Sequence, residues 1–184
     1  MILRCTSKLQ AIVGRPEPAS ASRAASGDDF YANLIWIEGR KCLLVTHAGT
    51  LFSVFAPDVR AADLRPIGAF VVPLLTRQLV TEGFSPVALG PLNSEAVTIA
   101  KTADRRVLGC MNDLALHCSY VAENAGGLAL LDLGALHHHL ERNLSSVSAY
   151  IYPIELVAER AELTKETNDE EPARDGLSTL TRLR

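Results

Sequence analysis

The sequence predicts an α+β fold: a single domain with a small antiparallel sheet, a meander plus one added strand, covered by helices. Three short apolar runs separated by tight turns lie between residues 31 and 55, which is typical of a β-meander. Helical periodicity of apolar residues dominates the chain after residue 104. Hydrophobic residues make up 48% of the 184 residues and charged residues 21%, a composition that suits one globular domain.

The N-terminal segment predicts a short strand, a short helix and a loop. Residues 2–5 alternate weakly and are expected to form a strand. Thr6 is a plausible N-cap for a helix through Val13, which Gly14 would end. Residues 15–29 are rich in Pro, Ser, Ala and Gly without periodicity, so we expect a flexible loop there.

The meander is predicted from three runs, at residues 31–37, 42–46 and 51–55. Glu38-Gly39 and Ala48-Gly49 supply the two turns between them. The second and third runs are almost wholly apolar. We therefore expect both faces of these strands to be covered.

The next part of the chain predicts a helix, a strand and a long helix. A helix is expected over residues 63–82, starting after Asp63, kinked or split at Pro73 and ended by Gly83. Residues 95–101 predict the added strand. Asp104 is expected to cap the longest helix, in which apolar residues recur at steps of three and four up to residue 124.

The C-terminal part predicts two more helices and a tail. The helices are expected over residues 132–143 and from Pro153 to about Leu163. Residues 155–175 hold eight acidic side chains against three basic ones, and apolar periodicity stops near residue 164. We therefore predict a domain at residues 1–163 and a mobile acidic tail at residues 164–184.

Composition excludes several classes of protein. The net charge is −3 and the isoelectric point is near 5.9, which weighs against non-specific nucleic-acid binding. No apolar run approaches the roughly 20 residues of a membrane helix. Arg4, Lys8 and Gln10 interrupt any apolar segment of a signal peptide, so we expect a cytoplasmic protein without a membrane partner. The four cysteines lack zinc spacing and are expected to be small buried residues; no metal or cofactor is predicted.

Two groups of polar residues invite a catalytic or metal-binding interpretation. His137, His138 and His139 point about 100° apart on a helix and cannot converge on one ion, so we expect a polar helix face. Cys110 and His117 lie roughly 10 Å apart along their helix, too far for a nucleophile and its base. We expect a solvated flank, which comprises Arg106, Cys110, Asp113, His117, Tyr120 and Asn124.

The segment Lys101-Thr102-Ala103-Asp104-Arg105-Arg106 is the least ordinary feature of the sequence. It places two arginines in the first turn of a helix, where the macrodipole disfavours cations. Exposed backbone N–H groups with these cations would suit a phosphate or a carboxylate. The alternative is that both arginines reach acidic neighbours or water.

Several segments of the chain also resemble one family. These are Arg4-Cys5-Thr6-Ser7-Lys8-Leu9, Phe30-Tyr31-Ala32-Asn33-Leu34, Arg40-Lys41-Cys42-Leu43-Leu44 and the stretch from Lys101 to Asp113, which is similar to Lys-Thr-x-x-Arg-Ser-Val-Leu-Gly-Ser-Met-Asn-Asp. The family is an uncharacterised bacterial domain of unknown function, number 6933. The chain departs from its pattern at Tyr31, Arg106 and Cys110, where the family has His, Ser and Ser. The resemblance implies no activity.

The junction and the resemblance together suggest ligand- or partner-binding residues: Lys101, Thr102, Arg105, Asn112, Asp113, Arg4 and Lys41. The favoured hypothesis is a non-enzymatic binding or regulatory protein that meets an anionic ligand, nucleic acid or protein partner through this basic junction. The alternative is a small enzyme acting on a phosphate-containing substrate with Asp113 and Lys101. Enzymes usually show convergent titratable groups, and only these two qualify.

Overall fold

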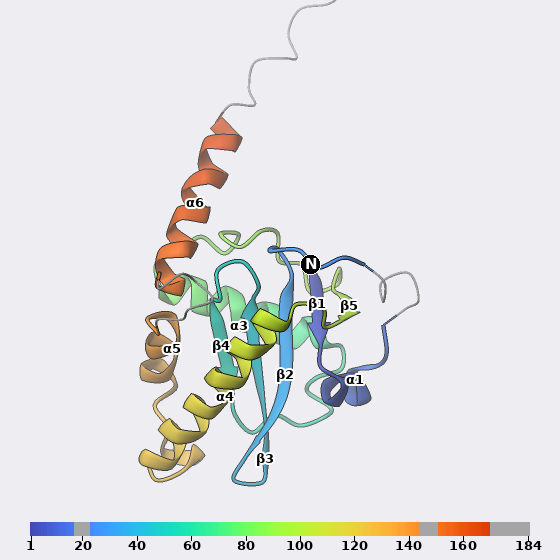
Figure 1. Cartoon of the computed structure of the whole chain (residues 1–184), viewed down its shortest axis with the longest axis vertical. Helices are drawn as coiled ribbons and strands as arrows, with labels where there is room; N and C mark the ends of the chain where they lie inside the picture. The colour runs from blue at the N-terminus through green and yellow to red at the C-terminus, as the bar shows by residue number, and fades with distance from the viewer. Residues whose placement is uncertain (17–22, 144–150, 170–184) are drawn as a thin grey trace, which may run out of the picture.

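The computed structural model describes residues 1–16, 23–143 and 151–169 (Figure 1). These residues form one sheet with helices on both faces. The elements are β1 (Ile2–Cys5), α1 (Ser7–Val13), β2 (Phe30–Ile37), β3 (Arg40–His47), β4 (Ser53–Ala56), α3 (Ile67–Thr81), β5 (Thr98–Lys101), α4 (Arg105–Asn124), the 3-10 helix η1 (Leu128–Leu130), α5 (Leu133–Glu141) and α6 (Pro153–Asp169).

The sheet is mixed, with the strand order β4-β3-β2-β1-β5. The antiparallel meander β2-β3-β4 is confirmed, but β1 pairs in parallel with both β2 and β5. The expectation of an antiparallel sheet is therefore wrong for β1 and β5. The physical reason is the connection: residues 6–29 separate β1 from β2 and include α1, which is long enough for a parallel crossover.

Two apolar cores lie on opposite faces of the sheet. Alternate residues of each strand face opposite sides, so Leu3, Phe30 and Val45 pack with α1, α3 and α6. Tyr31, Leu44 and Phe55 pack with α4 and α5 on the other face. The nearly continuous apolar runs of β3 and β4 are buried on both sides, as the sequence predicts.

The Asp104 cap of α4 is confirmed, and α1 and α5 begin where the sequence predicts, although the Thr6 side chain makes no capping hydrogen bond. Thr6 precedes α1, and Gly14 ends it with φ of +104°, a conformation that favours glycine. The Asp104 carboxylate accepts a hydrogen bond of 2.8 Å from the backbone N–H of Arg106 at the start of α4. Asp132 accepts one of 3.0 Å from Ala135 at the start of α5.

Other predicted boundaries are wrong. Asp63 precedes α3 and binds Arg60 instead of capping a helix, so α3 begins only at Ile67. Pro73 does not split α3, which continues to Thr81 with the proline exposed. The added strand is shorter than expected, because residues 95–97 precede β5.

The C-terminal helix extends past the predicted domain boundary. Helix α6 reaches Asp169, six residues beyond Leu163, and Figure 1 shows its C-terminal half projecting from the body. Residues 17–22 of the predicted loop and residues 170–184 of the predicted tail lie outside the described residues. The division into a domain and a mobile tail stays a prediction.

Helix α5 packs against β4, the strand at one edge of the sheet. Its Glu141 carboxylate accepts a hydrogen bond of 3.0 Å from the Ser53 N–H, and His137 Nε2 lies 3.0 Å from both the N–H and the C=O of Phe55. His137 is only 6% exposed, so the prediction of a polar face is wrong for this histidine, whereas His138 and His139 are exposed. Residues four apart on a helix share one face, which lets these two side chains bind alternate groups of an edge strand.

Burial raises the pKa of the Glu141 carboxyl well above its usual value. The folded protein therefore holds this proton more tightly than the unfolded chain, and the free energy of unfolding falls as pH rises from about 4.3 to the folded pKa. Glu141→Gln keeps an oxygen for the Ser53 N–H and removes the titration. We expect urea unfolding curves to show the variant gaining stability over the wild type as pH rises through that window. The exposed Glu162→Gln is the control, and an equal slope in Glu141→Gln and wild type would contradict the prediction.

Candidate functional site

The candidate site lies where β1 and β5 end side by side. Cys5 pairs with Lys101 at the carboxyl ends of these parallel strands. The chain leaves β1 for α1 on one face of the sheet and leaves β5 for α4 on the opposite face. Ligands of open α/β sheets bind at the carboxyl ends of parallel strands where the connections diverge in this way.

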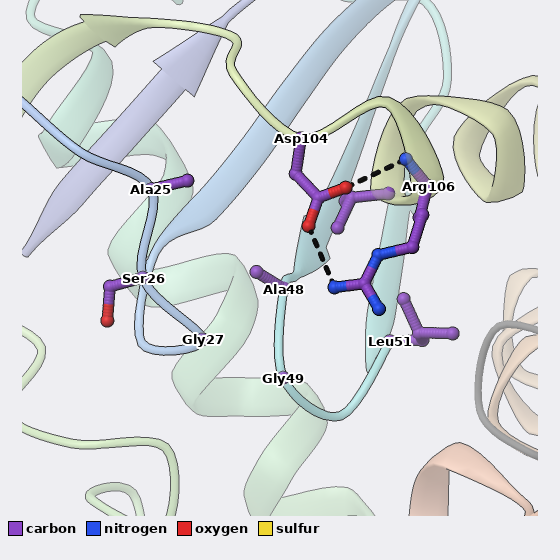
Figure 2. Close-up of a pocket in the computed structure, with 9 residues that line it drawn as sticks. Ala25, Ser26, Gly27, Ala48, Gly49, Leu51, Asp104 and Arg106 are labelled. Carbon is purple, nitrogen blue, oxygen red and sulfur yellow. Dashed lines mark hydrogen bonds and ion pairs between the residues drawn. The ribbon is translucent and has the colours of Figure 1, made fainter.

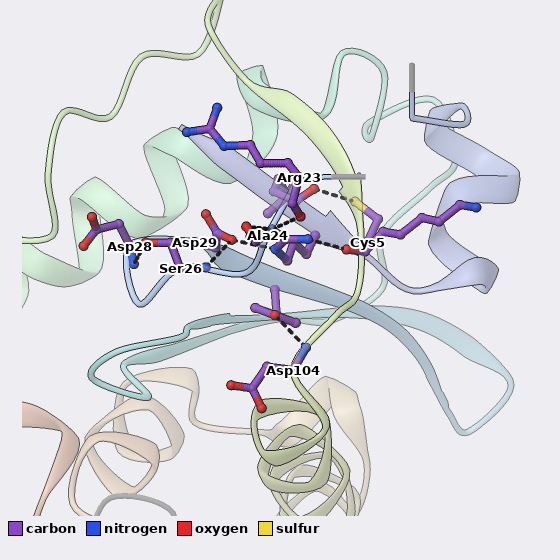
Figure 3. Close-up of polar contacts among 11 residues, drawn as sticks. Cys5, Arg23, Ala24, Ser26, Asp28, Asp29 and Asp104 are labelled. Carbon is purple, nitrogen blue, oxygen red and sulfur yellow. Dashed lines mark hydrogen bonds and ion pairs between the residues drawn. The ribbon is translucent and has the colours of Figure 1, made fainter. Parts of the chain in front are cut away.

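A buried arginine holds this junction together (Figure 3). The Arg4 side chain is fully buried, and its Nε donates to Asp29 Oδ2 at 2.5 Å. Its Nη1 donates to the Lys101 carbonyl at 2.8 Å, and its Nη2 donates to the carbonyls of Arg23 and Ala24 at 2.9 and 2.6 Å. Arg4 thus ties the end of β5 to the segment that precedes β2.

The start of α4 is held by a second set of contacts. The Tyr31 hydroxyl accepts a hydrogen bond of 3.0 Å from the Asp104 N–H. The Asp104 carboxylate also lies 3.2 Å from the Arg106 guanidinium, which lowers the pKa of Asp104 and raises the pKa of Arg106. Arg106, one of the two arginines in the first turn, is therefore paired with the capping residue. This matches the alternative expectation that the arginines reach acidic neighbours or water. No described residue forms an ion pair with the exposed Arg105 or Lys101.

A cavity of about 300 Å³ opens beside the first turn of α4 (Figure 2). It lies between the segment before β2, the turn after β3 and the Asp104–Arg106 pair. A Cβ on Gly49 would lie 2.8 Å from the Gly27 carbonyl oxygen, so glycine is required for these two loops to meet. The lining residues are Ala25, Ser26, Gly27, Ala48, Gly49, Leu51, Asp104, Arg106 and Val107.

Comparison with known proteins places the chain in a family. The family described as Domain of unknown function (DUF6933) matches residues 2–156. The chain belongs to the DUF6933 family. The matched region runs from β1 to the first residues of α6 and so contains the whole sheet and the junction. Searches of curated proteins and of solved structures find no significant match.

The DUF6933 fold brings together only some of the predicted site residues. Arg4, Lys101 and the half-buried Thr102 meet at the junction, and Arg105 comes three residues after Thr102 in the chain. Arg4 has no exposed surface to offer a ligand, so it positions the junction from beneath. The structure thus corrects the prediction of Arg4 as a contact residue.

The other predicted site residues lie away from the junction. Lys41 is at the opposite end of the hairpin, as the cross-strand partner of Trp36. Asn112 and Asp113 are exposed on α4, about 10 and 12 Å along the helix axis from Arg105. The structure therefore does not bring Asp113 and Lys101 together.

The polar flank of α4 is less solvated than predicted. Cys110 is buried, and the Nε2 atom of the half-buried His117 is shielded from solvent. All four cysteines are buried, and burial raises the pKa of Cys5 and of Cys118 to about 12. Within the described ranges, no three His, Cys, Asp or Glu side chains are placed to hold a metal ion, and no helix is long and apolar enough to cross a membrane.

Sequence reasoning missed Asp29 and Tyr31, the two residues that complete the junction. A signal for the first was present: Arg4 stands between apolar residues in a strand and needs a buried carboxylate. Tyr31 stood out in the sequence only as a departure from the family pattern; its hydrogen-bond partner, a backbone group 73 residues away, was not visible there.

Proposed function

We propose that this DUF6933 domain is a non-enzymatic binding protein that recognises an anionic small molecule at the junction of β5 and α4. Lys101 and Arg105 supply the positive charge, and the cavity lined by the neighbouring Asp104 and Arg106 holds the rest of the ligand. The observation that carries the proposal is that a rigidly held backbone segment presents two exposed cations without a partner among the described residues.

The rigidity of the segment supports a binding role. The Lys101 carbonyl is held by Arg4, and the Asp104 N–H is held by Tyr31, so both ends of the turn between them are fixed from below. Binding sites gain affinity when supporting residues hold the contact residues in place before the ligand arrives.

The size and charge of the site favour a small ligand over nucleic acid. A volume of about 300 Å³ is at the lower end of ligand pockets. The net charge of −3 would repel an extended polyanion, whereas two local cations are enough for one phosphate or carboxylate group. Asp104 already caps α4, so the ligand anion would bind to the side chains of Lys101 and Arg105 rather than to the helix N-terminus.

The separation of Asp113 from Lys101 supports binding over catalysis. A proton-transferring group must come within about 3 Å of the reacting atom, directly or through one water. Asp113 lies two to three helical turns away from the junction. The cavity itself offers one carboxylate, and that carboxylate is paired with Arg106.

The proposal is tested with the purified full chain and three probes: inorganic phosphate, AMP and citrate. We expect at least one probe to raise the thermal midpoint and to bind in calorimetry, with an affinity that falls as salt rises. Lys101→Glu with Arg105→Glu should weaken this binding at least tenfold, because both exposed cations become anions.

The matched control is a charge reversal of two exposed arginines elsewhere, Arg15→Glu with Arg77→Glu. It makes the same change in net charge and should leave binding within about twofold. Equal binding by the junction variant and the wild type would contradict the proposed site. A failure of all three probes to bind would contradict the ligand class.

A further inference from the structure

The outer side of α4 is an uncovered face that carries large apolar residues. Figure 1 shows α4 in front of the sheet, and no described element lies over its outer side. Leu116 and Tyr120 on this side are 71% and 65% exposed. The exposed residues lie within about 60° of one line along the helix. We name them the α4 outer face: Arg105, Gly109, Asn112, Asp113, Leu116, Tyr120 and Glu123.

Gly109 is the unexplained member of this face. It lies in the interior of α4, where glycine weakens a helix relative to alanine. A Cβ at this position would meet no atom within 4 Å, so nothing in the described chain requires a glycine there. The glycine leaves a notch on the outer face, with Leu116 projecting two turns further along.

We propose that the α4 outer face binds the same face of a second copy of this chain, with the two helices antiparallel. In this arrangement Leu116 of each copy fills the notch at Gly109 of the other. The two-fold axis then passes between Asn112 and Asp113, and Arg105 of each copy falls opposite Tyr120 of the other. A two-fold interface is self-complementary in this way, because each contact occurs twice.

The charges on the face select the antiparallel direction. The N-terminal end carries the exposed Arg105, and the C-terminal end carries the exposed Glu123. Antiparallel packing brings each arginine close to the other copy's Glu123 and opposes the two helix dipoles, whereas parallel packing would place like charges together.

The expected association is weak and reversible. The face from Arg105 to Tyr120 is about 22 Å long, which is a single helix pair and a small interface. We therefore test it by sedimentation velocity of the full chain from about 5 to 500 µM. The weight-average mass of the wild type should rise towards that of a dimer over this range.

Two substitutions test the packing of Leu116 into the notch at Gly109. Gly109→Leu and Leu116→Glu should each weaken association at least tenfold, with circular dichroism and thermal midpoints confirming that both variants fold. Val80→Glu is the matched control, since Val80 is an exposed apolar residue of α3 on the opposite face of the sheet. It should associate like the wild type.

A charge exchange separates this interface from the anion site. Arg105→Glu and Glu123→Arg should each weaken association, and the double variant should restore it to within about threefold of the wild type. Anion binding at the junction should stay weakened in the double variant, because Arg105 is absent. A wild type that is monomeric up to 500 µM would overturn the proposal. So would association that is insensitive to Gly109→Leu and Leu116→Glu, or a double variant that fails to associate.

Discussion

Replacing Arg4 with alanine is expected to destabilise the domain by about 3–5 kcal/mol, the cost of breaking a buried ion pair by removing one partner. Asp29 is 2% exposed and would lose its guanidinium partner, and the carbonyls of Lys101, Arg23 and Ala24 would each lose a donor. Arg4→Lys should also be costly, because one ammonium group cannot reproduce the planar fork that reaches all these acceptors. Chemical denaturation at pH 7 measures both effects.

The matched control for Arg4 is Arg40→Ala. Arg40 also pairs with an aspartate, Asp58 at 2.8 Å, but both side chains are more than half exposed. Such pairs contribute about 0–1 kcal/mol, so this variant should unfold close to the wild type. An Arg4→Ala variant that lost no more free energy of unfolding than Arg40→Ala would show that the buried network does not hold the junction. The junction would then not be a preorganised binding site.

Leu114→Ala is expected to destabilise the domain by about 2–5 kcal/mol, through lost burial and the cavity left behind. Leu114 is 5% exposed and packs with Val107, Met111 and Cys118 on the inner side of α4, against Tyr31 and Leu44 of the sheet. Equilibrium urea unfolding gives the free energy, and an unchanged slope with denaturant would show that the change lies in stability alone.

Leu116→Ala is the matched control on the same helix. Leu116 is 71% exposed, so the same truncation should change stability by less than about 0.5 kcal/mol when measured at low protein concentration. His117→Ala should cost less than about 1 kcal/mol, since no hydrogen bond to His117 Nε2 is lost. A larger cost for His117 than for Leu114 would mean that α4 is rotated from the packing described above.

The sequence indicated the family, but it did not show which arginine in the first turn of α4 is paired. The segment from Lys101 to Asp113 led to the family resemblance, and the match over residues 2–156 confirms the family. The arginines in the first turn of α4 marked the junction because they contradict the preference of the helix dipole. Which of them is paired was decided only by the structure, in which the Asp104 carboxylate lies 3.2 Å from the Arg106 guanidinium.

The wrong interpretation of His137 has a similar cause. Rotation by 100° per residue correctly excludes a shared metal ion, but it does not tell which face of α5 is buried. The buried face is chosen by the edge of β4, whose Ser53 and Phe55 need hydrogen-bond partners that the sheet does not supply. An edge strand 82 to 88 residues earlier in the chain thus decides that His137 and Glu141 point inward.

The sequence by itself determined the local elements of this protein: the starts of α1 and α5, the Asp104 cap of α4, the meander and the apolar stripe of α4. Caps, tight turns and helical periodicity join residues two to four apart, so their physics is contained in short stretches of chain. Only the tertiary structure decided that β1 runs parallel to both neighbours and that Arg4 is buried at the junction. The contacts of Arg4 with Asp29 and Lys101 join residues 25 and 97 positions apart in the chain. Such contacts depend on how the whole sheet and its helices pack.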